Sequence, residues 1–244
     1  MPAGTSPPKF IDQLRARSEA VRAQDRQSTR PVEEALAYMD RRMWAAFRWL
    51  DEAVQHLEVI RPAVAHTTFA IPGVLALADL AYDRGFVSFR RRTMGSLDVI
   101  EYIQLFYRLS HPKPVIVRVQ PGAAANVEER LRAAHLPFRY DTEQDAQRVV
   151  RTGVFTVTAH ITSSVRFVPD YRRQRVEVSL RNVDRFEPVT LDFPSTALDE
   201  GALEDLVHLI LGEGNQFLRR APLAGVTNRT ADLPPGRSSR QYAV

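Results

Sequence analysis

Two acid–histidine pairs and one isolated histidine are the side chains in this sequence best suited to acid–base or metal chemistry. Glu52 precedes His56, and Glu204 precedes His208, by one turn of a helix. A di-metal helical bundle needs several inward-facing Glu residues and two Glu-x-x-His motifs, which the chain does not supply. We therefore expect both pairs to be surface ion pairs. His160 stands among Thr and Ser residues in a predicted strand, where a solvated sheet face is the ordinary environment.

Sequence motifs with an established catalytic mechanism are absent. The chain contains no Gly-x-x-x-x-Gly-Lys-Ser/Thr loop, Gly-x-Gly-x-x-Gly, His-Glu-x-x-His or Gly-x-Ser-x-Gly. It also contains no cysteine, which excludes disulfides, thiolate nucleophiles and cysteine-ligated metals. The sequence therefore indicates no metal and no cofactor, and it favours a binding protein over an enzyme.

Arginine is the residue type whose distribution in this sequence says most about possible binding partners. The 244 residues include 33 Lys and Arg, of which only Lys9 and Lys113 are lysines, a usage typical of GC-rich bacterial genomes. Residues 84–118 carry seven cations against two carboxylates, whereas residues 198–213 carry five carboxylates and no Lys or Arg. Guanidinium groups form paired hydrogen bonds with carboxylates and phosphates. The candidate anion-binding residues on one polar sheet face are Arg90, Arg92, His160, Arg166, Arg175 and Arg181.

These arginines allow three interpretations. They are compatible with a solvated face that forms its own ion pairs, for which Glu177 and Asp192 are available. They are also compatible with an acidic protein partner or self-association, or with the phosphate of a small ligand such as a nucleotide. Nucleic acid is disfavoured, because the net charge is only +4 and the basic runs lack interleaved aromatic residues apart from Phe86 and Phe89.

The first quarter of the chain is predicted to be a helical rod spanning residues 9–62. Apolar residues recur at helical spacing over residues 10–26, and after Pro31 they recur every three or four residues as far as Pro62. We expect two helices, over about 10–26 and 31–61, that pair as an antiparallel hairpin. The shorter helix leaves part of the longer one uncovered, which predicts a homo-oligomer or a protein partner. The predicted association seam is Leu36, Met39, Met43, Phe47, Leu50 and Leu57.

Residues 63–220 are predicted to form an α+β body. Residues 154–193 alternate between apolar and polar side chains, which predicts an antiparallel meander with one covered and one polar face. The segment 96–109 favours a helix, although its aromatic and β-branched residues also permit a strand. The other expected elements are a β-hairpin within 63–93, strands over 114–119 and 137–140, and helices over 124–135, 143–151 and 198–211.

The expected fold class is therefore α+β, with a long-helix hairpin or coiled coil followed by a mixed, largely antiparallel sheet with flanking helices. Residues 1–8 and 221–244 lack apolar periodicity and are expected to be a disordered end and a flexible tail. The sequence has no run of 18 apolar residues and no signal peptide, so we expect a cytoplasmic protein without a membrane partner. Two functions follow as hypotheses: a scaffold that associates through the rod and the polar sheet face, or a sensor of an anionic small ligand.

Overall fold

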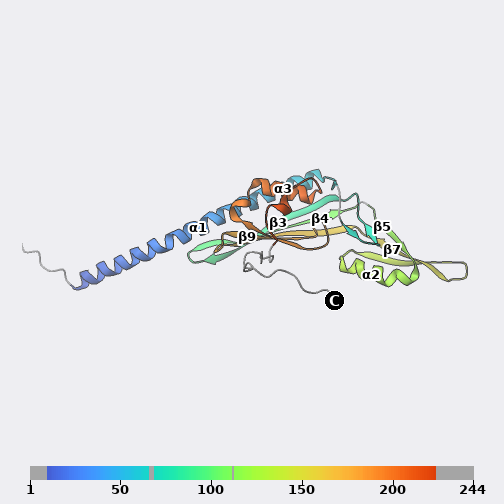
Figure 1. Ribbon diagram of the computed structural model, residues 1–244, viewed down its shortest axis with the longest axis horizontal. Coiled ribbons are helices and arrows are strands. Elements are labelled where there is room, and N and C mark those ends of the chain that lie inside the picture. Colours follow the sequence, from blue (N-terminus) through green and yellow to red (C-terminus); the bar gives the residue numbers. More distant parts are fainter. Residues whose placement is uncertain (1–9, 66–68, 112, 224–244) are drawn as a thin grey trace, which may run out of the picture.

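The computed structural model describes residues 10–65, 69–111 and 113–223, with the side chains of residues 12, 13 and 22–30 excepted (Figure 1). The predicted disordered end and most of the predicted tail lie outside these residues. The elements, in chain order, are α1 (Phe10–Ile60), β1 (Ala70–Ile71), β2 (Leu75–Ala76), β3 (Ala81–Met94), β4 (Leu97–Ser110), β5 (Val115–Val119), η1 (Pro121–Ala123), α2 (Ala124–Ala133), β6 (Phe138–Gln144), β7 (Val150–Val157), β8 (His160–Asp170), β9 (Arg175–Arg181), β10 (Val189–Pro194), η2 (Ser195–Ala197), α3 (Glu200–Ile210) and η3 (Phe217–Arg219).

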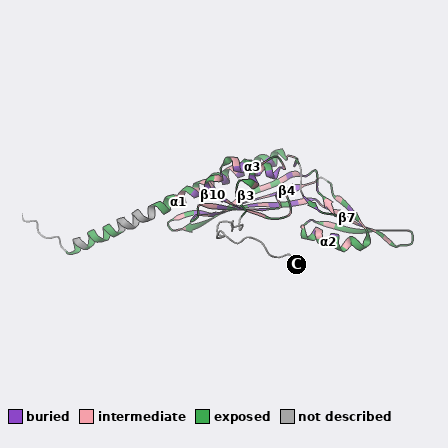
Figure 2. Ribbon diagram, viewed as in Figure 1, coloured by how far each residue is buried: buried purple, intermediate pink, exposed green. Residues whose placement is uncertain are grey.

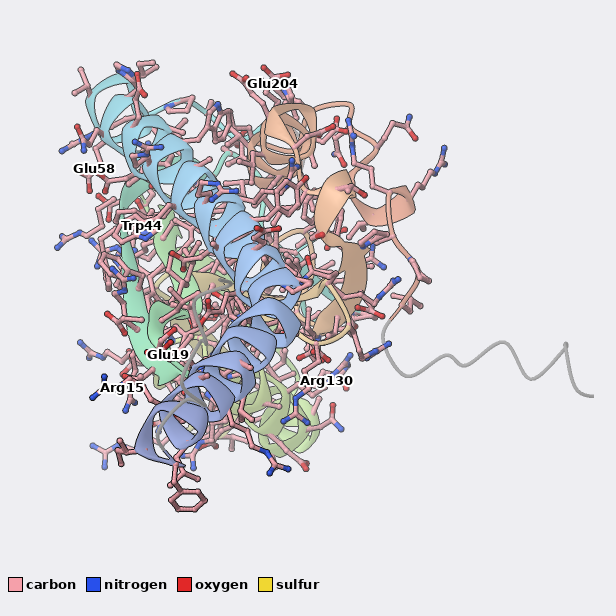
Figure 3. All side chains as sticks on the ribbon, turned by 90° about the vertical axis from the view of Figure 1, so that its left-hand side faces the viewer. Arg15, Glu19, Trp44, Glu58, Arg130 and Glu204 are labelled. Atoms are coloured by element: carbon pink, nitrogen blue, oxygen red, sulfur yellow. The ribbon has the colours of Figure 1, made fainter. Side chains whose placement is uncertain are left out.

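The N-terminal rod is one helix and not a hairpin. Helix α1 continues through residues 27–29, where the sequence predicts a break, and it contains Pro31 in its interior. A proline inside a helix removes one backbone hydrogen bond and bends the axis, but it does not have to end the helix. Figure 3 shows the axis of α1 changing direction between its two halves. The expected pairing of residues 10–26 with 31–61 is therefore wrong.

The core lies between one face of a five-stranded sheet and two helices. The strand order is β10-β9-β8-β4-β3, and every neighbouring pair is antiparallel. Helices α1 and α3 cover the same face (Figure 1), and the residues that meet between them and the sheet are buried (Figure 2). From α1 this core receives Met39, Met43, Ala46, Leu50, Val54 and Leu57.

A second, three-stranded sheet extends the molecule at the end opposite the projecting part of α1 (Figure 1). Its order is β5-β7-β6, so β7 separates two parallel strands that are connected through α2. Helix α2 buries Val127 and Leu131. The strands predicted over 114–119 and 137–140, the helix predicted over 124–135 and the last helix are confirmed. The meander predicted over 154–193 is confirmed from His160 onward as β8-β9-β10, whereas residues 154–157 belong to β7 in the second sheet.

Two segments predicted to be helices are not helical: one is a strand and the other is the tip of a β-hairpin. Residues 96–109 form β4, a central strand that pairs with β3 on one side and β8 on the other. Residues 143–151 form the tip of the β6–β7 hairpin. The Asp145 carboxylate accepts hydrogen bonds from the backbone N–H groups of Gln147 and Val149, at 2.9 Å each, and so stabilises the turn. Asp145 therefore stabilises a turn where the sequence predicts the first turn of a helix over 143–151.

Asp40 connects α1 to an irregularity in the sheet. The register of β3 against β4 shifts between Arg90 and Arg91, and Asp40 Oδ1 accepts a hydrogen bond of 2.8 Å from the N–H of Ile100 at this point. The Tyr171 hydroxyl donates to the Ile100 carbonyl at 2.8 Å and lies 3.4 Å from Asp40 Oδ1. Burial, followed by the charge of Asp40, raises the pKa of Tyr171. The helix is thus fixed to the sheet at one bulge.

Replacing Asp40 by Ala is expected to lower the free energy of unfolding by about 1–3 kcal/mol, because the Ile100 N–H loses its partner in a partly buried environment. Urea denaturation followed by circular dichroism measures this change. Glu52→Ala is the matched control, because the Glu52 carboxylate is exposed and has only a 4.0 Å contact with His56. Equal stability of the two variants would show that Asp40 does not fix α1 to the sheet.

Candidate interaction surfaces

The first half of α1 projects from the body (Figure 1). Ser96, in the β3–β4 turn, donates a hydrogen bond of 2.7 Å to Glu33 where the helix leaves the sheet. Beyond this point, toward the N-terminus, apolar side chains face solvent. The exposed fractions are 74% for Phe10, 46% for Leu14, 53% for Val21 and 61% for Val32.

These exposed side chains continue the buried stripe of the same helix. At about 3.6 residues per turn, Leu14, Val21 and Val32 fall on the same side of the helix as Met39 and Leu50. The body shelters only the second half of this stripe. We define the projecting stripe as Phe10, Leu14, Val21 and Val32.

The association seam predicted from the sequence is an internal interface. Met39, Met43, Leu50 and Leu57 are buried in the single chain, and Leu36 and Phe47 are half-buried against the same core. The sheet and α3 cover this part of the helix, where the sequence led us to expect a second helix or another chain. The spacing of apolar residues indicates that one helix face is covered, but it does not indicate which element covers it.

The opposite face of the five-stranded sheet carries the polar side chains expected from the alternation. Register pairs place Arg90 opposite Tyr102, Arg166 opposite Gln104 and Ser179, and Arg181 opposite Ser164. Arg175 and His160 lie on this face at opposite ends of the meander, opposite Asp170 and Ser110 respectively. Because β4 separates β3 from β8, Arg90 does not adjoin Arg166. The predicted residues share a face but do not converge on one point.

Several of these arginines already have partners. Arg90 pairs with Glu101 at 3.1 Å, and Arg175 pairs with Asp192 at 2.6 Å. The Arg166 guanidinium lies 4.0 Å from the centre of the Tyr102 ring, and that of Arg92 lies 6.0 Å from the Tyr171 ring. Arg166 and Arg181 are diagonal neighbours across β8 and β9. This face is therefore a mixed polar surface whose candidate cationic side chains are spread over three strands, β3, β8 and β9.

His160 borders a small cavity. Its Nδ1 atom is buried without a hydrogen-bond partner. The adjacent cavity has a volume of about 110 Å³ and lies between the segment after α2, the start of β8 and the segment after β9. None of the candidate arginines lines it. A cavity of this size with a polar lining accommodates water. The lining residues are Ala134, His135, Leu136, His160, Ile161, Thr162, Asn182 and Phe186.

A larger cavity of about 510 Å³ lies at the C-terminal end of α3. Asp184, Asp205 and Arg219 contribute charged groups to it, but Asp184 pairs with Arg185 at 2.7 Å and Asp205 with Arg220 at 2.5 Å. Of the acidic residues in and beside α3, Asp199 and Asp205 pair with Arg220, and Glu213 pairs with His208. The cavity has no cluster of unpaired charges among the residues described.

The acid–histidine pairs are surface contacts. Glu52 and His56 are both about three-quarters exposed, and His208 contacts Glu213 at 2.5 Å in place of Glu204. In the described ranges, no three His, Asp or Glu side chains are grouped as metal ligands. None of the described helices is long and apolar enough to span a membrane.

Comparisons of the chain with protein families, with curated proteins and with solved structures found no match. The fold and the surfaces described above are therefore the basis for the function proposed below. Sequence reasoning missed one surface, the outer edge of β3 with its aromatic side chains. Phe86 and Phe89 lie between the arginines of residues 84–92, but no sequence pattern indicates that their strand lies at an edge of the sheet.

The hydrogen bonds of Asp205 should make the folded chain less stable in acid. Burial alone would raise the pKa of Asp205, but hydrogen bonds from Arg220 and from the Gln216 N–H, with the nearby positive charges, lower it. Because the pKa is lower in the folded than in the unfolded chain, the stabilisation is complete above the unfolded pKa of about 3.9 and is lost as the pH falls through the folded pKa.

We therefore expect Asp205→Asn to lower the free energy of unfolding at pH 7 by about 1 kcal/mol, as for the loss of one hydrogen bond. The difference from the unmodified chain should shrink below about pH 4. Asp141→Asn is the control, because Asp141 is half-exposed and pairs only with Arg139 on its own strand. A difference that stays constant down to pH 2.5 would contradict this assignment.

Proposed function

We propose that this protein is a scaffold that self-associates through the projecting half of α1, in an antiparallel coiled coil between two copies of the chain. The observation that carries the proposal is the projecting stripe, which continues the buried face of α1 and is covered by no described part of the chain. An exposed apolar stripe of this length is unfavourable in water and is typical of an association surface.

The position of the body favours an antiparallel arrangement. The body lies at one end of the projecting segment (Figure 1). Two antiparallel segments place the two bodies at opposite ends of the coiled coil, whereas two parallel segments place them at the same end, where they compete for space.

The expected binding of an anionic small ligand on the sheet face has weaker support. The candidate residues lie on three different strands and do not converge on one point, and Arg175 is held in a short ion pair with Asp192. We retain this face as a second contact surface of the proposed scaffold. The cytoplasmic location expected from the sequence remains part of the same proposal.

The double variant Leu14→Glu, Val21→Glu is expected to raise the dissociation constant of the dimer at least tenfold, or about 1.4 kcal/mol, because two carboxylates would replace apolar contacts. Sedimentation equilibrium of the full chain measures this constant. The matched control is the double variant Ala16→Glu, Ala20→Glu, which introduces the same two charges outside the projecting stripe.

Circular dichroism must show that the variants retain the helical content of the unmodified chain. A monomeric unmodified chain at tens of micromolar would overturn the proposal. The proposal would also fail if the control pair Ala16→Glu, Ala20→Glu weakened association as much as Leu14→Glu, Val21→Glu does.

A further inference from the structure

The two edges of the five-stranded sheet differ in how they are covered. At the β10 edge, Leu191 forms a bridge with Leu223, and the Asp192 N–H donates to the Pro222 carbonyl at 3.0 Å. The chain itself therefore protects this edge. The other edge is the outer side of β3, which spans Ala81–Met94.

Only the beginning of the β3 edge has partners. Ala81 forms a bridge with Ala63, and the Tyr82 N–H donates to the Pro62 carbonyl at 2.9 Å. The Gly85 N–H donates to Glu58 Oε1 at 3.0 Å, which shows that the backbone of Gly85 faces outward. The register with β4 is regular from Arg84 to Arg90, so the backbone groups of Val87 and Phe89 face outward as well. No described segment pairs with them.

Aromatic side chains flank the free part of this edge on both faces of the sheet. On the α1 side, the Phe89 ring lies 4.8 Å from both Trp44 and Phe47 and is 37% exposed. Figure 3 shows Trp44 between α1 and the sheet edge. On the other face, Phe86 packs against Phe106 at 5.2 Å and is 58% exposed. An added strand would direct alternate side chains to these two apolar positions.

The charge of this edge selects the kind of strand that fits. Arg91 is held by Asp40, Asp98 and the Trp44 ring. The side chains of Arg84 and Arg90 are 69% and 68% exposed, although each has one carboxylate neighbour, Asp83 at 3.8 Å and Glu101 at 3.1 Å, and Arg92 is exposed beside the Tyr171 ring. A guanidinium group carries five N–H donors, so an exposed one can bind a second carboxylate. A second copy of the same edge would bring these arginines together, and like charges on paired edges oppose association. An acidic strand would instead bring carboxylates to guanidinium groups.

We propose that the free edge of β3 binds an extended acidic peptide of a partner protein by strand addition. Main-chain hydrogen bonds form at Val87 and Phe89. Apolar side chains of the peptide contact the Trp44–Phe47–Phe89 cluster and Phe86, and its Asp or Glu residues contact Arg90 and Arg92. This binding is independent of self-association through the projecting stripe.

The test uses the full chain and two fluorescent peptides, one with Glu alternating with Val and Phe, and one with Lys in place of every Glu. Fluorescence anisotropy should show that the acidic peptide binds and that the basic peptide binds at least tenfold more weakly. Hydrogen exchange should slow at the amides of Val87 and Phe89 when the acidic peptide is added. Equal binding of both peptides, or no binding of either, would overturn the proposal.

Two variants separate strand addition from general charge attraction. Val87→Pro removes an outward N–H at a position where an edge strand tolerates proline, and it should weaken binding at least tenfold. Arg90→Glu with Arg92→Glu should have a similar effect, whereas Arg181→Glu, away from the edge, should change affinity less than about threefold. A folded Val87→Pro chain that binds with unchanged affinity would rule out strand addition. If Arg181→Glu weakened peptide binding as much as Arg90→Glu with Arg92→Glu does, the net charge of the chain and not the β3 edge would explain the binding.

Discussion

The contact between one face of α1 and the inner face of the five-stranded sheet determines the rest of the structure. Met39, Met43 and Leu50 are completely buried there, and Ala46 provides a small residue where the helix approaches the strands. Burying each large apolar side chain contributes about 1.5–3 kcal/mol. Because this interface ends where the sheet ends, near Glu33 and Ser96, no described part of the chain packs on the remaining helix.

Polar contacts then fix the position of the helix along the sheet. Asp40 bonds to the Ile100 N–H at the β-bulge, and Arg42 donates to the Leu198 carbonyl at 3.0 Å near the start of α3. Apolar packing alone tolerates small shifts of a helix along a sheet, whereas these hydrogen bonds require one register. The direction of the projecting segment and the placement of Trp44 beside Phe89 both follow from that register.

The sequence was most informative where apolar and polar residues alternate strictly, as they do in a strand with one buried face. The alternation in β8, β9 and β10 predicted both faces of the meander, including the face that holds Arg166, Arg175 and Arg181. It was least informative for β4, because a central strand pairs on both sides and half of its residues face a core, so its apolar spacing resembles that of a helix.

Long-range contacts account for the other differences. Pro31 was expected to begin a helix, but α1 continues through it and bends. The apolar stripe after Pro31 was correctly placed on one helix face, yet its partner is a sheet formed by residues far along the chain. The β3 edge could not be recognised from the sequence, because strand order decides which strand lies at an edge, and no local pattern encodes it.

The antiparallel coiled coil is tested most directly by the distance between spin labels on two copies of the chain. The chain has no cysteine, so Ile11→Cys and Ser18→Cys, which lie seven residues apart on the same side of the projecting helix, each provide one labelling site. Pulsed electron paramagnetic resonance should give a shorter distance for the label at residue 18, which is nearer the middle of the segment, than for the label at residue 11. Equal distances at both positions would show a parallel pairing, and the absence of dipolar coupling would show that the helix does not associate.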